Sequence, residues 1–139
     1  MLALTFCTTA AAACGERVDA PTGPSSPASF AGTYALQTVN GAPLPYTLLD
    51  LGLFRLVIIS DVLTFRNDGV VTETNTSDTF QQGIGTSRRT QTGVGSFTVR
   101  GNTVTVTWPV SGIYTYTRNG SLLSVFEPQF GATWVYRRQ

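Results

Sequence analysis

The sequence predicts an all-β protein with one small antiparallel up-and-down β-barrel of eight to ten strands over residues 30–139. Charged residues make up only 12% of the chain, while Thr, Gly, Val and aromatic residues are abundant, a composition that favours strands. Beyond Phe30, apolar side chains recur at every second position in short runs. Turn-forming residues separate these runs, which is typical of hairpins.

Ten runs are expected to be strands, and three of the connections carry strong turn signals. Asn67-Asp68-Gly69, Gly101-Asn102 and Asn119-Gly120 supply residues that tolerate the positive φ of a tight hairpin. They join successive strands, as in a meander. The expected strands are Thr33–Val39, Phe54–Ile59, Val62–Arg66, Val70–Ser77, Gly85–Gln91, Gly95–Arg100, Thr103–Trp108, Gly112–Arg118, Leu122–Glu127 and Thr133–Arg137.

Alternation within these runs indicates a sheet with one buried and one solvated face. Examples are Leu63 with Phe65, and Val104 with Val106 and Trp108. Closing the sheet into a barrel buries the apolar face and removes the unpaired edges, so a barrel is favoured over a sandwich, which remains the alternative. Two segments are irregular. Residues 42–60 are expected to form a long loop that leads into a buried strand, with a lid as the alternative, and residues 81–92 an exposed loop or ragged strand ends.

The N-terminal segment 1–14 is typical of an export signal. An uncharged apolar run ends at Ala11-Ala12-Ala13-Cys14, where small residues precede a cysteine as in a lipobox, so lipidation is expected at Cys14. Cleavage after an Ala-x-Ala site and an uncleaved apolar tail are the alternatives. Residues 15–29 are rich in Pro, Ser and Gly, which predicts a flexible linker. We therefore expect a cell-envelope protein held by a lipid anchor, with the outer membrane preferred and a soluble periplasmic or secreted form as the alternative.

Missing residue types exclude several kinds of chemistry. The chain has no His, and every basic residue is Arg, so His-based nucleophile pairs, His-ligated metals and Lys-dependent sites are absent. The carboxylates Asp61, Asp68, Asp78 and Glu127 look isolated, and we expect no enzyme, no cofactor and no metal, although Asp50, Asp61 and Asp78 could meet at a Ca²⁺ site. With a net charge of +1, no nucleic-acid partner is expected, and the protein is expected to be a monomer.

Several short motifs resemble the uncharacterised lipocalin-like lipoproteins of soil bacteria. They are Gly32-Thr33-Tyr34-Ala35-Leu36, Val39-Asn40-Gly41, Pro43-Leu44-Pro45, Leu63-Thr64-Phe65 with Asp68-Gly69, Gly101-Asn102-Thr103-Val104 and Val135-Tyr136-Arg137-Arg138. The resemblance spans the whole domain and implies a lipocalin-like barrel. Lipocalins begin with Gly-x-Trp, whose ring packs beneath an Arg of the last strand. The resemblance gives these roles here to Gly32-Thr33-Tyr34 and Arg137.

Two functional hypotheses follow. In the first, the barrel binds a small apolar ligand through interior aromatic residues, which would otherwise be ordinary core. The candidate lining residues are Tyr34, Phe65, Phe97, Trp108, Tyr114, Tyr116 and Trp134. In the second, the chain is an interaction or inhibitor module that acts through exposed apolar loop residues at one barrel end. Its candidate residues are Tyr46, Leu48, Leu49, Leu51, Phe126 and Phe130.

Overall fold

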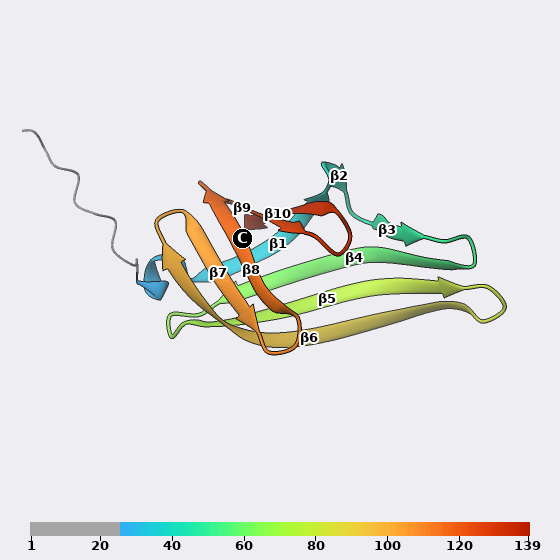
Figure 1. Ribbon diagram of the computed structural model, residues 1–139, viewed down its shortest axis with the longest axis horizontal. Coiled ribbons are helices and arrows are strands. Elements are labelled where there is room, and N and C mark those ends of the chain that lie inside the picture. Colours follow the sequence, from blue (N-terminus) through green and yellow to red (C-terminus); the bar gives the residue numbers. More distant parts are fainter. Residues whose placement is uncertain (1–25) are drawn as a thin grey trace, which may run out of the picture.

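A computed structural model describes residues 26–139, which form a closed antiparallel β-barrel of eight strands (Figure 1). Strand β1 pairs with β10 along one edge and with β4 along the other, which closes the sheet. Cys14 and the export-signal residues lie outside the described part. The barrel strands are β1 (Gly32–Val39), β4 (Phe54–Phe65), β5 (Val70–Gln81), β6 (Gly85–Arg100), β7 (Thr103–Trp108), β8 (Gly112–Asn119), β9 (Leu122–Glu127) and β10 (Ala132–Arg138).

The prediction of a single up-and-down barrel is confirmed, and the three predicted turns fall between consecutive strands. Gly69, Gly101 and Gly120 all have positive φ, the conformation that the turn residues were expected to supply. Among the described residues, no helix has the length and apolarity that a bilayer span requires.

One end of the barrel is closed by Phe30. This residue follows a short 3-10 helix, η1 (Pro27–Ser29), which begins at the capping residue Ser26 within the segment expected to be linker. The Phe30 ring is fully buried, stacks on Tyr34 at 5.2 Å and meets the edge of Phe65 at 4.8 Å. Because Arg118 lies over the same ring at 5.4 Å, this end is sealed by apolar and cation–π contacts.

The arginine of the last strand that lies against the start of β1 is Arg138, whereas the resemblance gave this role to Arg137. Alternation along β10 places Trp134 and Tyr136 inside the barrel, and Arg138 continues on that side, whereas Arg137 faces solvent. Arg138 donates a hydrogen bond to the carbonyl oxygen of Ala31 at 2.6 Å. A Cβ atom at Gly32 would lie only 2.9 Å from the Arg138 Nε. The role given to Arg137 by the resemblance was therefore misplaced by one residue.

The two segments expected to be irregular are largely strands. Strands β4, β5 and β6 run on past the rest of the barrel as a long arm (Figure 1). Residues 81–92 are the far end of the β5–β6 hairpin, whose pairs continue to Gln81 and Gly85. Residues 42–60 hold β2 (Ala42–Pro43) and β3 (Tyr46–Asp50), and β3 pairs with the first part of β4. The expected long loop at residues 42–60 was wrong for β2 and β3, whereas the expected strand at residues 54–59 is the start of β4. Residues 81–92, expected as an exposed loop or ragged strand ends, are exposed strand ends that stay paired.

Candidate functional site

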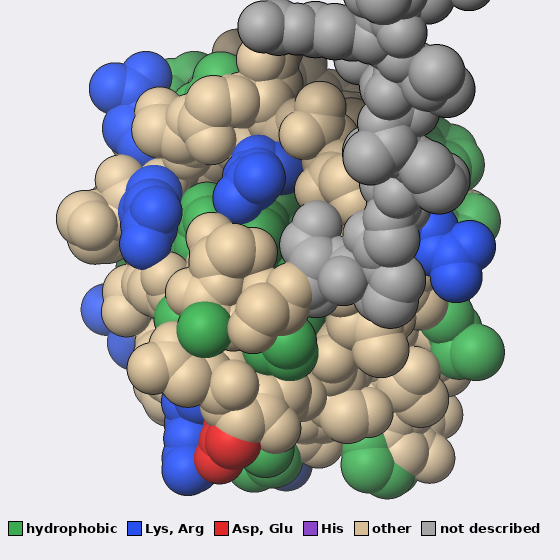
Figure 2. Space-filling model, turned by 90° about the vertical axis from the view of Figure 1, so that its left-hand side faces the viewer, with side chains coloured by type: hydrophobic (Ala, Val, Ile, Leu, Met, Phe, Trp, Pro, Cys, Tyr) green, Lys and Arg blue, Asp and Glu red, His purple; other side chains and the backbone are tan. Residues whose placement is uncertain are grey.

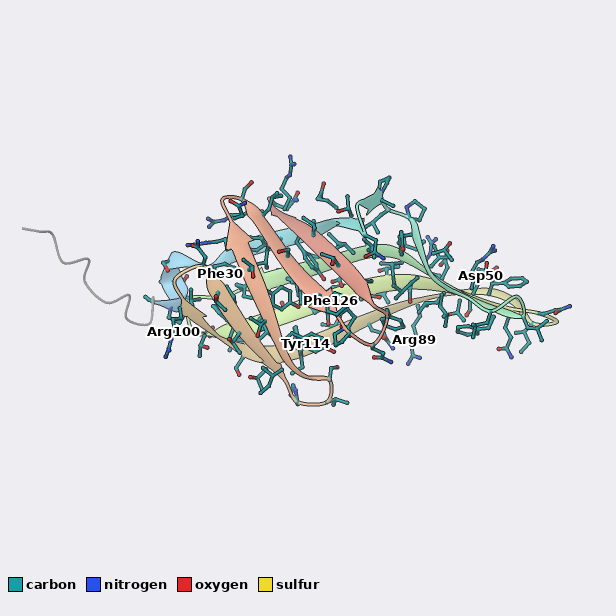
Figure 3. The ribbon with its side chains drawn as sticks, turned by 45° about the horizontal axis from the view of Figure 1, so that its top comes forward. Phe30, Asp50, Arg89, Arg100, Tyr114 and Phe126 are labelled. Atoms are coloured by element: carbon teal, nitrogen blue, oxygen red, sulfur yellow. The ribbon has the colours of Figure 1, made fainter. Side chains whose placement is uncertain are left out.

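The barrel interior is apolar at the closed end and polar toward the open end. Around Phe30 lie Tyr34, Phe65, Phe97 and Val99, all buried in one core. Toward the other end, the inward positions carry Asp61 on β4, Glu73 and Asn75 on β5, and Glu127 on β9. Figure 3 shows Phe30 at the closed end and Asp50 far out along the arm.

A pocket of about 220 Å³ occupies this open end. Its rim includes the exposed residues Ser111 and Gln129, and its floor includes the buried residues Tyr116 and Tyr136. The pocket is therefore a recess in the barrel that solvent can reach. The complete lining is Glu73, Trp108, Ser111, Tyr114, Tyr116, Val125, Glu127, Gln129, Trp134 and Tyr136.

Beneath the pocket lies the only buried charged residue among residues 26–139, Asp61, which is 1% exposed. Its Oδ2 accepts hydrogen bonds from Asn75 Nδ2 and from the Tyr136 hydroxyl, both at 3.3 Å. Its Oδ1 accepts no hydrogen bond from an N–H or a hydroxyl group among residues 26–139. The Glu73 carboxylate on the neighbouring strand is close enough to share a proton with Asp61. The two carboxyl groups therefore form a pair that is held together across β4 and β5.

Burial dominates the ionisation of this pair. It raises the pKa of Asp61 well above the usual value, and the negative charge of Glu73 raises it further. Burial also raises the pKa of Glu73, and the charge of Glu127 acts in the same direction. Two like charges in one desolvated site repel each other, so the pair retains a proton at a pH where exposed carboxyl groups have lost theirs.

Aromatic side chains form much of the pocket wall. Trp108, Tyr114, Tyr116 and Trp134 all line the pocket. Trp134 is 8% exposed, and its indole N–H has no hydrogen-bond acceptor within the described chain. A buried donor without a partner is uncommon in folded proteins, so this N–H is available to a bound molecule. Burial raises the pKa of Tyr116 far above the usual value, so its hydroxyl stays protonated.

The seven aromatic residues that the sequence singled out fall into two groups. Four of them meet at the pocket: Trp108, Tyr114, Tyr116 and Trp134. The other three, Tyr34, Phe65 and Phe97, pack around Phe30 in the closed end and do not reach the pocket.

Sequence reasoning missed Glu73, Asn75, Val125 and Tyr136, and it treated Asp61 and Glu127 as isolated. The sequence did carry a signal for these two residues, because side chains at every second position of a strand point to the same face. Asp61 is therefore on the buried face with Leu63 and Phe65, and Glu127 is on the buried face with Leu123 and Val125. The register of β4 against β5, which pairs Asp61 with Asn75 and Leu63 with Glu73, was not readable from the sequence.

The suggested Ca²⁺ ligands do not converge. Asp50 lies on the exposed arm, Asp61 lies inside the barrel, and Asp78 is paired with Arg88 at 2.7 Å. Within residues 26–139 no three His, Cys, Asp or Glu side chains are arranged to hold a metal ion.

The six candidate interaction residues are also divided. Tyr46 and Leu48 pack partly against the core, and Leu49 is half-buried on β3. Leu51, Phe126 and Phe130 are exposed. Leu51 lies at the tip of the arm with two exposed residues that the sequence analysis had not selected, Leu53 and Ile84. We call Leu51, Leu53 and Ile84 the arm tip.

Comparison of the chain with protein-family models, with curated proteins and with solved structures finds no match. The fold and the pocket therefore carry the functional argument, because no relative supplies one.

Proposed function

We propose that this protein is a small-molecule-binding barrel of the bacterial cell envelope and that its ligand occupies the pocket at the open end. The pocket, with an unpartnered buried donor in its wall, carries the proposal. Trp134 Nε1 is buried without a partner among residues 26–139. Leaving such a group unpaired costs about 1–3 kcal/mol, a cost that a bound molecule can offset.

The size of the pocket limits the ligand. At about 220 Å³ it lies below the 300–1,000 Å³ range of pockets for drug-sized molecules. It corresponds to about seven waters at roughly 30 Å³ each, which suits a compact molecule with a single ring. The carboxylates of Glu73 and Glu127 in the wall favour a ligand with polar groups over the purely apolar ligand expected from the sequence.

The envelope part of the proposal rests on the sequence before residue 26 and on the charge of the closed end. Arg118 covers Phe30 and Arg138 covers Gly32, so both lie where the described chain begins. Figure 2 shows the closed end with more basic than acidic side chains on its surface. A lipid anchor at Cys14 would bring this basic end within reach of anionic lipid headgroups.

Both tryptophans of the chain line the pocket, which gives a direct assay. We expect compact ring-containing molecules to change the tryptophan fluorescence of the purified protein in a saturable manner. Ser111→Phe at the rim and Val125→Phe deeper in the wall should abolish this change. Ile113→Phe is the matched control because Ile113 is 70% exposed and does not line this pocket. The proposal fails if no compound titrates, or if both blocking variants bind as well as the wild type.

Membrane attachment needs its own test. Mass spectrometry of the protein purified from membranes should find a diacylglyceryl group on Cys14. An unmodified, full-length mass from the cytoplasm would defeat the envelope proposal and leave the binding proposal untouched.

A second candidate function is interaction with another protein through the arm tip. Leu51, Leu53 and Ile84 are 66%, 66% and 78% exposed, and large apolar side chains gathered at an extremity often mark interaction sites. Cross-linking in cells should then capture a partner that is lost in the triple variant Leu51→Ser, Leu53→Ser, Ile84→Ser. The same cross-links with the triple variant as with the wild type would exclude this role.

A further inference from the structure

The charges of the pocket point to the chemical class of its ligand. Among residues 26–139 the two ion pairs are Arg66 with Asp68 and Arg88 with Asp78. The acidic groups at the open end, Asp61, Glu73 and Glu127, are not part of either pair. This end of the barrel therefore carries negative charge that the described arginines leave uncompensated.

A basic group beside the pocket, Arg89, forms no ion pair with these carboxylates. Arg89 lines a shallow groove together with Glu73 and Asn75 just outside the pocket, but it lies beyond ion-pair distance of any carboxylate. It is exposed on β6 where the sheet leaves the barrel, a position labelled in Figure 3. Water screens an exposed guanidinium strongly, so the pocket itself keeps its negative potential.

The walls favour an organic cation over a metal ion. Ca²⁺ takes six to eight oxygen ligands, whereas rings make up much of this lining. The faces of Trp and Tyr attract ammonium groups, and most strongly where water is excluded. Trp108 is 7% exposed and Trp134 is 8% exposed, so both indoles are largely desolvated.

One buried polar atom of the wall independently indicates a bound molecule: the indole N–H of Trp134 has no acceptor among residues 26–139. Asp61 lies one layer below the pocket, beside Glu73 and Tyr136, which do line it. A cation next to Glu73 would compensate both members of this pair.

We propose that the pocket binds a small organic amine whose ammonium group lies against Glu73 and Glu127 and whose body packs on Trp108 and Trp134. This inference rests on the proposed binding function and specifies its ligand. Asp61 acts as a positioning residue in this arrangement: it is buried beneath the floor and influences the ammonium group through Glu73. The ligand's cation takes the place of the proton that Asp61 and Glu73 would otherwise share.

Amine binding should therefore release protons and weaken as the pH falls. The groups that face the pair are Asn75 on β5, Tyr136 on β10, Tyr116 and Tyr114 on β8, and Glu127 on β9, with Arg89 outside the rim on β6. Among them, the negative charge of Glu127 raises the pKa of Glu73, and protonation of Glu73 lowers the affinity for the amine.

Three ligands with one ring and different charges test the inference: 2-phenylethylamine, 2-phenylethanol and phenylacetate. Calorimetry on the wild type should give the amine an affinity on the order of 10- to 100-fold above that of the alcohol, with the phenylacetate anion the weakest. Glu73→Gln should remove most of this preference. The control is Asp78→Asn, which removes one negative charge from the same strand outside the pocket and should keep the preference of the wild type.

The outcomes separate this inference from the proposed function. Equal affinities for the three compounds, or an amine affinity that Glu73→Gln does not change, would overturn the amine assignment and leave a binding pocket in place. If Glu73→Gln folds poorly, Glu127→Gln provides the same comparison from another strand. Absence of binding by all three compounds, together with no retained small molecule in native mass spectra, would overturn the binding function as well.

Discussion

Two glycines on β6 make the packing of the pocket testable, because they lie beneath the same tryptophan but have very different amounts of space. A Cβ atom built at Gly95 would lie 2.7 Å from the backbone oxygen of Thr107 and 2.7 Å from Cε3 of Trp108. At Gly93 the nearest atoms, Glu73 Oε2 and Trp108 Cζ3, are 3.7 Å away, which is ordinary contact. Only the first position requires the neighbouring strand or the indole to move.

We therefore expect opposite effects on stability. Gly95→Ala should cost about 1–3 kcal/mol, because a backbone oxygen cannot give way as a flexible side chain can. Gly93→Ala should be neutral or stabilise by about 0.4–1 kcal/mol, because alanine restricts the unfolded chain. Urea unfolding followed by tryptophan fluorescence measures both. Gly95→Ala should also weaken ligand binding, since Trp108 lines the pocket. Equal stability of the two variants would refute the packing argument.

Three further predictions follow from the core, the buried carboxyl pair and the arm. Phe30→Ala should cost about 3–5 kcal/mol in urea unfolding, because the ring is fully buried against Tyr34 and Phe65; a loss below about 1 kcal/mol would show that Phe30 does not seal the barrel. In the wild type the raised folded-state pKa of Asp61 means that its contribution to stability is greatest at low pH and is lost as the pH rises through that pKa. Asp61→Asn should therefore be more stable than the wild type at pH 8 by at least about 1 kcal/mol, with the gap closing toward pH 4, and a gap that widens on acidification would contradict the shift. The triple serine variant of the arm tip should unfold within about 0.5 kcal/mol of the wild type for each substitution, because exposed apolar side chains contribute little to folding, and a larger loss would mean that the tip is packed.

The fold could be predicted from local patterns because a barrel is specified by features that repeat along the chain. Alternation at Val104, Val106 and Trp108 indicates which side is buried, and the turn at Gly101-Asn102 indicates where the strand begins. The arm was harder to predict for the same reason. Residues 85–92 are exposed throughout and carry no apolar alternation, so the sequence left residues 81–92 open between an exposed loop and ragged strand ends, although Gly85–Gln91 was among the expected strands. Hydrogen bonding to β5, not burial of a face, holds that segment in the sheet.

The candidate site shows what alternation within a strand cannot predict. Alternation placed Trp108, Tyr114 and Tyr116 on the inward face, but it does not tell how far along the barrel axis each residue lies. The pocket residues therefore could not be separated from Tyr34 and Phe97 of the closed end. Depth follows from the stagger of strands around the closed sheet, which is a property of pairing between segments far apart in the chain. The closure of one barrel end by Phe30 could not be predicted for the same reason, since the ring contacts residues from several strands.

The sequence by itself determined that this chain alternates between a buried and a wet face, turns at defined glycines and lacks the residues for His- or Lys-based chemistry. Only the tertiary structure decided that Asp61 and Glu73 meet and that Phe30 closes one end of the barrel. The physical reason is that alternation is encoded within one strand. The register between strands, which brings charges and rings together, is set by the pairing of the whole sheet.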